Sequence, residues 1–96
     1  MATDPKEQGR AGRRRAVALK YDGSRDSAPR IAAKGQGKLA ERIIELARQH
    51  GVPIKEEPSL VEILSRLDLN QEIPPETYVV VARILAWAYQ LNGKTP

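Results

Sequence analysis

Alternating apolar and polar positions predict two strands in the first third of the chain. Residues 16–21 carry Val, Leu and Tyr at every second position, which is the period expected of a strand with one bulky face. Residues 22–29 are rich in turn-forming residues and should end this strand. The apolar run at residues 30–34 then predicts a second, shorter strand.

A helix and a third strand are expected next. Apolar residues recur at i, i+4, i+7 and i+8 within residues 38–50, as on one face of a helix. Gly51 suits the position just beyond the helix C-terminus. Residues 52–56 then form a short strand, and pairing with residues 30–34 would give a right-handed parallel crossover.

Two more helices are predicted in the second half. Ser59 and Glu62 have the spacing of a capping box and predict a helix over residues 60–67. Pro75 suits the first turn of a last helix, which should run to about Leu91.

The last helix carries apolar residues on two nearly opposite sides. One side holds Val80, Ile84, Trp87 and Leu91, and the other holds Tyr78, Ala82, Leu85 and Tyr89. A small domain has few elements to cover both sides. Either the helix is sandwiched between other elements, or one side stays open as a docking surface.

The composition narrows the chemistry. Ninety-six residues with 41% apolar residues suffice for one small domain. The absence of cysteine and the single histidine, His50, exclude disulfides, thiolate metal sites and multi-histidine metal clusters. Gly35 and Gly37 match only a fragment of a dinucleotide-binding pattern. We therefore expect no catalytic residue, no metal and no cofactor.

The net charge of +4 is concentrated at the N-terminus. Residues 1–14 should form a disordered basic tail, followed by a folded domain at 15–93 and a short tail at 94–96. An electrostatic arm is available in this region, formed by Arg10, Arg13, Arg14 and Arg15. One alternative function of the protein is therefore a module that uses this arm to bind nucleic acid or another anionic surface.

Four motifs resemble the cytoplasmic C-terminal domain of the FlhB/YscU family, the export-switch proteins of flagellar and virulence type III secretion. The motifs are AVALKYD at 16–22, APRIAAKG at 28–35, HGVPI at 50–54 and QEIPPETY at 71–78. The resemblance implies an α/β fold, a small mixed sheet of about three to four strands surrounded by three or more helices.

The chain departs from the family pattern in two ways. Full-length members begin with transmembrane helices, whereas this sequence has no apolar stretch that could span a bilayer, so we expect a stand-alone copy of the soluble part. The family's self-cleaving Asn-Pro-Thr-His motif is replaced here by Ala11, Gly12, Arg13 and Arg14. Self-cleavage should be absent, together with the strand upstream of the cleavage point. The edge of residues 16–21 should then be open.

The resemblance implies that export substrates dock on an apolar patch formed by Ala28, Pro29, Ala82 and Leu85. The expected function is that of a non-enzymatic adaptor of the flagellar or type III protein export apparatus, acting in export-substrate recognition or specificity switching as a cytoplasmic monomer at the export gate. Its expected partners are export-apparatus proteins, including a membrane-bound FlhB-family protein, and export substrates. Nucleic acid and the membrane interior are not expected partners, and an uncharacterised enzyme is the third alternative.

Overall fold

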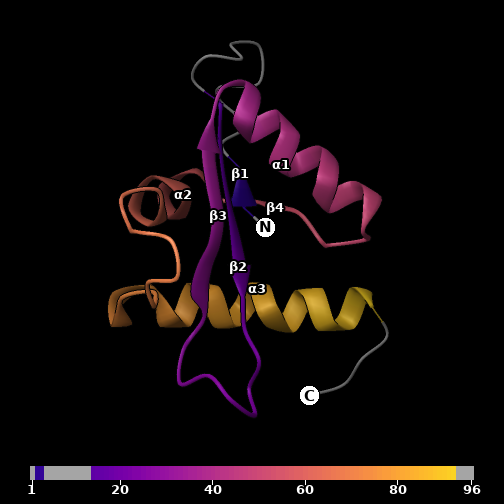
Figure 1. The fold of residues 1–96 in the computed structure, drawn as a ribbon. Helices are drawn as coiled ribbons and strands as arrows, with labels where there is room; N and C mark the ends of the chain where they lie inside the picture. The colour runs from indigo at the N-terminus through magenta and orange to yellow at the C-terminus, as the bar shows by residue number, and fades with distance from the viewer. Residues whose placement is uncertain (1, 4–13, 93–96) are drawn as a thin grey trace.

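The computed structural model describes residues 2–3 and 14–92. The expected α/β class with a small mixed sheet is confirmed, and Figure 1 shows a long β-hairpin crossed by the last helix. The elements in chain order are β1 (Ala2–Thr3), β2 (Arg15–Lys20), β3 (Arg30–Gln36), α1 (Lys38–Gln49), β4 (Lys55–Glu56), α2 (Pro58–Leu64), the 3-10 helix η3 (Pro75–Thr77) and α3 (Tyr78–Leu91).

The sheet has the strand order β3-β2-β1-β4. β2 is antiparallel to both β3 and β1, whereas β1 and β4 run parallel. Within the hairpin, Ala18 pairs with Ala33 and Leu19 pairs with Ile31, which leaves Ala32 as an extra residue. This β-bulge bends the hairpin and increases its local twist.

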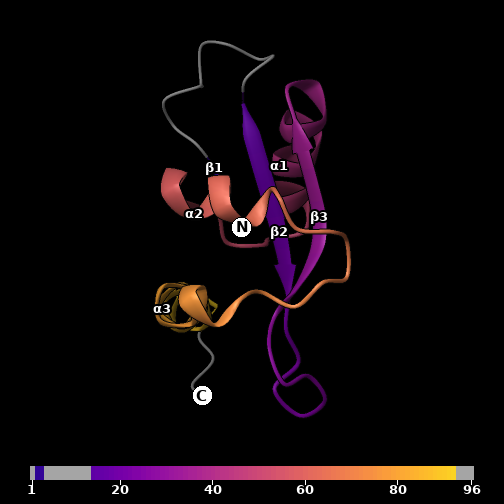
Figure 2. The ribbon, with the colours of Figure 1, turned by 90° about the vertical axis from the view of Figure 1, so that its left-hand side faces the viewer.

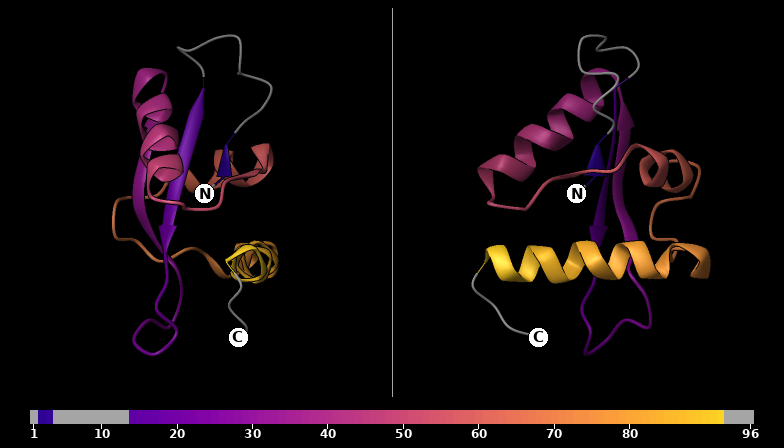
Figure 3. Two further views of the ribbon diagram at one scale, coloured as in Figure 1. Left: turned by 90° about the vertical axis from the view of Figure 1, so that its right-hand side faces the viewer. Right: turned by 180° about the vertical axis from the view of Figure 1, so that it is seen from behind.

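The period of two in β2 separates two cores. Ala16 packs against α1 through Ala40, Ile43 and Ile44. Val17, the next residue, belongs to the cluster that includes residues of α2 and α3. Figures 2 and 3 show α1 and α2 on opposite sides of the hairpin. Small residues therefore face α1, and bulky residues face α2 and α3.

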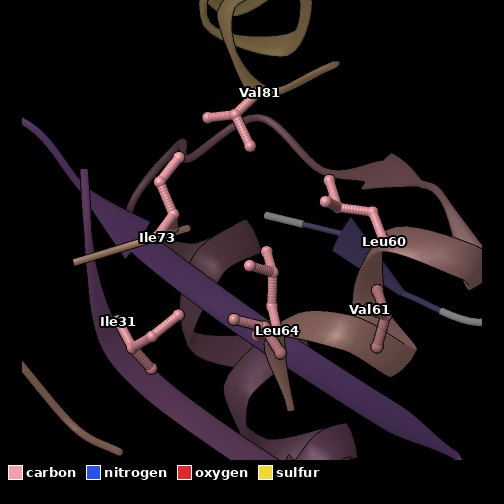
Figure 4. Close-up of a cluster of buried hydrophobic side chains, with 7 residues drawn as sticks. Ile31, Leu60, Val61, Leu64, Ile73 and Val81 are labelled. Atoms are coloured by element: carbon pink, nitrogen blue, oxygen red, sulfur yellow. The ribbon is translucent and has the colours of Figure 1, made fainter. Parts of the chain in front are cut away.

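The larger core joins five parts of the chain, namely β2, β3, α2, the segment before η3, and α3. Its buried residues are Val17, Ile31, Leu60, Val61, Leu64, Ile73 and Val81. Figure 4 shows side chains from β3, α2 and α3 converging on this cluster. Because Val81 is the buried residue that α3 supplies, this core fixes the position of the last helix.

The C-terminus of α1 confirms the predicted role of Gly51. Its φ of +68° is in the left-handed region that favours glycine. The Gly51 N–H donates to the Arg48 carbonyl (3.2 Å), and the Val52 N–H donates to the Ala47 carbonyl (2.8 Å). These are the two hydrogen bonds of a Schellman motif, which satisfy carbonyl groups at the helix end.

The predicted pairing of residues 52–56 with residues 30–34 is wrong. Only Lys55 and Glu56 form a strand, and β4 pairs with β1. Both edges of β3 are already used near its start. β2 pairs along one edge. On the other edge, the Ile31 N–H donates to Gln71 (3.0 Å) and its carbonyl accepts from Asn70 (2.8 Å).

The predicted capping box at Ser59 is also wrong. The helix α2 runs from Pro58 to Leu64, so it begins two residues earlier and ends three residues earlier than the helix predicted over residues 60–67. Glu57 is its N-cap residue, and no side-chain hydrogen bond caps this helix end among the described residues. Proline at the first helical position has a suitable φ, and its missing N–H removes one of the amides that have no partner at a helix start, which explains the earlier start.

The edge of β2 is not open at its first half. Ala2 pairs with Val17, and Thr3 pairs with Ala16, so β1 lies where we expected a missing strand. Two residues of the expected disordered tail at 1–14 therefore belong to the sheet. Residue 1 and residues 4–13 of that tail lie outside the described residues, as does the short tail at 94–96.

A polar network holds the segment before α3 against the hairpin. The Arg30 guanidinium donates to the Asn70 carbonyl (2.9 Å) and pairs with the Glu72 carboxylate (3.1 Å). The Ser27 hydroxyl donates to the same carboxylate (2.8 Å). Next to it, the Ile73 N–H donates to the Pro29 carbonyl (2.9 Å). These bonds determine where the chain enters the last helix.

Candidate docking surface

The helix α3 buries a narrow seam and exposes most of its remaining surface. Val81 is 1% exposed, and Ile84 and Leu85 pack against the larger core on either side of it. The two apolar sides predicted from the sequence therefore flank the seam, and neither is fully covered. Figure 1 shows α3 passing across the hairpin.

We name these two sides the Ala82 flank and the Trp87 flank. The Ala82 flank consists of Tyr78, Ala82, Leu85 and Tyr89. The Trp87 flank consists of Val80, Ile84, Trp87 and Leu91. Tyr78 and Ala82 are exposed on the first, and Val80 and Leu91 are exposed on the second. Exposed apolar groups gathered on one helix are typical of protein-interaction surfaces.

The four predicted patch residues do not share one environment. Ala82 is exposed and Leu85 is half-buried, so α3 presents both at the surface. Ala28 is only 3% exposed, and Pro29 is also buried. The Pro29 carbonyl bonds Ile73, whose side chain packs in the same core as Val81. In this structure Ala28 and Pro29 lie beneath the surface, and the docking role of the four residues stays a prediction.

A groove on the Trp87 flank was missed by the sequence analysis. Its volume is about 310 Å³, and the Lys55 ammonium lies 5.1 Å from the centre of the Trp87 ring. This distance is within the range of a cation–π interaction. The lining residues are Lys55, Glu57, Val80, Arg83, Ile84 and Trp87. No local pattern could indicate this site, because it requires the short strand β4 to lie beside α3.

The predicted basic arm is divided by the fold. Arg10 and Arg13 lie outside the described residues. The Arg14 carbonyl accepts a hydrogen bond from the Gly37 N–H (2.7 Å), and Arg15 is the first residue of β2. Both are half-buried. Arg15 of the proposed arm therefore belongs to the sheet, and Arg14 is hydrogen-bonded next to it.

The carboxylates of Asp22 and Asp26 shape a turn. The Asp26 carboxylate accepts the Asp22 N–H (2.8 Å), and the Asp22 carboxylate accepts the hydroxyl and the N–H of Ser24 (2.7 and 3.0 Å). The Ser24 hydroxyl, followed by the Ser24 N–H, lowers the pKa of Asp22, since both bonds favour the charged form.

His50 is exposed at the end of α1.

Residues 2–3 and 14–92 contain neither a candidate metal site nor a membrane-spanning helix. There, no group of three or more His, Asp or Glu side chains could hold a metal ion. The helices at these positions are too short or too polar to cross a bilayer.

The chain is similar in sequence and in structure to known proteins. The model of the FlhB HrpN YscU SpaS family matches residues 13–88. The cytoplasmic domain of FlhB from Shewanella putrefaciens has a similar structure, with a TM-score of 0.80 and 34% identity, covering 99% of this chain and 71% of that one. The PscU C-terminal domain has a TM-score of 0.71 and 26% identity, covering 76% and 94% of the two chains.

Two sequence relatives differ greatly in length. The protein YlqH of Bacillus subtilis is 44% identical over 79 residues, covering 82% of this chain and 85% of YlqH. The flagellar biosynthetic protein FlhB of Salmonella typhimurium is 46% identical over 77 residues, covering 79% of this chain but 20% of FlhB. The matched region and the shared fold together establish that this chain belongs to the FlhB HrpN YscU SpaS family.

Proposed function

We propose that this chain is a non-enzymatic adaptor of flagellar type III protein export, which binds export substrates and export-apparatus proteins in the cytoplasm at the export gate. Family membership and the FlhB-like fold support this role. The relatives named flagellar biosynthetic proteins support the flagellar system. The domain proposed to carry the function is residues 15–93 together with the β1 strand that pairs with it, and it acts as a monomer.

The observation that carries the proposal is the exposed Ala82 flank on a helix that the core holds in place. Val81 anchors α3 from one side, so the flank is presented without a further folding step. Tyr78 is 43% exposed, and Ala82 adds a small exposed position next to it. An extended apolar segment can pack across such a flank, and the predicted patch adds Ala28 and Pro29, which are buried in this structure.

The binding should be weak. The flank offers a shallow apolar strip, and a flexible partner segment loses conformational freedom when it becomes ordered there. We expect a dissociation constant of about micromolar or weaker. Weak binding suits an adaptor that must release each substrate after it has been selected.

A double substitution tests this surface. Ala82→Glu combined with Leu85→Asp should abolish capture of purified flagellar export substrates, because carboxylates cannot pack against an apolar segment. Gln90→Glu adds charge at an exposed position of the same helix and serves as the control. Circular dichroism checks the fold, and pull-down measures binding. Substrate capture unchanged in a folded double variant would refute the proposal.

Leu85 also contacts the core, so the double variant can lose its fold. In that case the single variant Ala82→Glu carries the test, since Ala82 is exposed and its replacement leaves the core untouched. Capture by that variant at the level of Gln90→Glu would refute the role of the flank.

A further inference from the structure

A polar cavity lies on the face of the hairpin that α2 covers. Its lining residues are polar or charged apart from one glycine, and none of them comes from α3. Its volume is about 370 Å³. The lining residues are Arg15, Lys34, Gly35, Gln36, Glu62, Ser65 and Arg66. They come from the start of β2, the end of β3 and the C-terminal end of α2. None of them belongs to the proposed export-docking surface.

Strand register explains why the basic residues meet there. Arg15 pairs with Gln36, and Val17 pairs with Lys34. Alternate residues of a strand point to the same face, so Arg15 and Lys34 share the face on which Val17 contacts the larger core. The apolar part of this face ends at Val17, and the cavity begins where the strand pair becomes basic.

The cavity carries excess positive charge. Three cations line it against one carboxylate, that of Glu62, which is already paired with Arg66 at 3.2 Å. The Lys34 ammonium donates to the Ser65 carbonyl (3.3 Å), which places it in the cavity wall and leaves further N–H donors. Within residues 14–92, the half-buried Arg15 guanidinium has no ion-pair partner. Two cations are thus available to a ligand.

The rim of the cavity includes an open strand edge. β3 is the outer strand of the sheet. Its outer edge is covered at Ile31 by Asn70 and Gln71, but no described segment pairs with that edge from Ala33 to Gly35. An exposed edge of this kind can align an extended chain by backbone hydrogen bonds.

We propose that this cavity binds a carboxylate side chain from an acidic, extended segment of a partner protein. The Arg15 guanidinium offers the planar donor pair that matches a carboxylate, and Lys34 adds a second positive charge. The edge of β3 aligns the backbone of the same segment. This site is independent of the proposed export function, since it could bind an acidic partner even if the Ala82 flank bound nothing.

The arrangement favours an acidic peptide over a phosphate. Phosphate sites commonly use free backbone N–H groups at a helix N-terminus or a glycine-rich turn. Here α2 contributes its C-terminal end, and the N–H of Gly37 is already bonded to the Arg14 carbonyl. The recognition elements left are side-chain cations beside a strand edge.

The test measures binding of a fluorescein-labelled hexaglutamate peptide by fluorescence anisotropy. Arg15→Gln combined with Lys34→Gln should weaken binding about tenfold or more, because it removes both available cations. The control is Arg42→Gln combined with Arg48→Gln, which removes the same charge from exposed positions of α1. If both double variants bind the peptide equally weakly, the loss of binding is explained by net charge alone, and the proposal is overturned.

Two further measurements test the kind of ligand and the role of the strand edge. Inorganic phosphate at matched ionic strength should not displace the peptide beyond the effect of added salt, and specific displacement would overturn the assignment to an acidic peptide. Amide NMR shifts on adding the peptide should include Lys34, whose N–H faces the open edge of β3 because Ala33 and Gly35 pair with β2. If Arg15→Gln with Lys34→Gln does not fold, Arg15→Gln alone should lose these shifts, and their retention would overturn the proposal.

Discussion

Leu39 lies directly over Gly35, so that a Cβ built on the glycine would stand 2.5 Å from the Leu39 Cγ. Gly35 ends the open edge of β3, and Leu39 is in the first turn of α1. The close approach lets the chain turn from strand into helix with the helix against the sheet. A glycine is required here because any side chain would occupy the space of Leu39.

Gly35→Ala should therefore lower the free energy of unfolding by about 1–3 kcal/mol, the usual cost of overpacking. Gly23→Ala is the control, because its added Cβ would meet Tyr21 at an ordinary 3.5 Å. Urea denaturation of both variants measures the difference. Equal stability of the two variants would mean that the partly exposed Leu39 moves aside freely.

Two neighbouring residues of α2 should respond very differently to truncation. Leu64 is fully buried in the larger core, whereas Ile63 is 46% exposed. Leu64→Ala should destabilise the protein by about 2–5 kcal/mol, because it leaves a cavity among close-packed side chains. Ile63→Ala should cost about 1 kcal/mol or less. Thermal unfolding compares them, and a similar loss in both would contradict the packing described for α2.

The hydrogen bonds in the turn at residues 22–26 predict that Ser24 influences the pKa of Asp22. Because the Ser24 hydroxyl lowers the pKa of Asp22 below its ordinary 3.8, Ser24→Ala should raise that pKa toward this value. The stabilisation from the Asp22 carboxylate is present above pH 3.8 and is lost as the pH falls through the lowered pKa. Carboxyl carbon NMR titration of both proteins measures the change. An unaltered Asp22 titration would exclude the Ser24 hydroxyl as the main cause.

Local patterns predicted most of the fold because the two sides of each element differ chemically. The alternation in β2 separates alanines that face α1 from bulky residues that face the larger core. Gly51 could be recognised because a left-handed helix end strongly favours glycine. These signals depend only on residues a few positions apart.

Long-range relationships could not be predicted in the same way. The pairing of β4 with β1 joins residues more than fifty positions apart, and each strand has only two residues. Such short strands carry no periodicity. Ala28 and Pro29 were expected at the surface with Ala82, but the hydrogen bond from Ile73 to Pro29 draws this segment beneath it. The basic cavity likewise required knowledge of the β2–β3 register.

The Trp87 flank offers a direct test of the position of β4, because Trp87 is the single tryptophan of the chain. The Lys55 ammonium lies over one face of its ring, at 5.1 Å from the ring centre. Lys55→Ala should uncover this face and increase quenching of Trp87 fluorescence by acrylamide, with a stability loss of about 0.5–1 kcal/mol. Lys38→Ala, at an exposed position of α1, should leave the quenching unchanged. If acrylamide quenches Trp87 no more strongly in Lys55→Ala than in Lys38→Ala, then Lys55 does not cover Trp87. In that case this contact does not close the groove between β4 and α3.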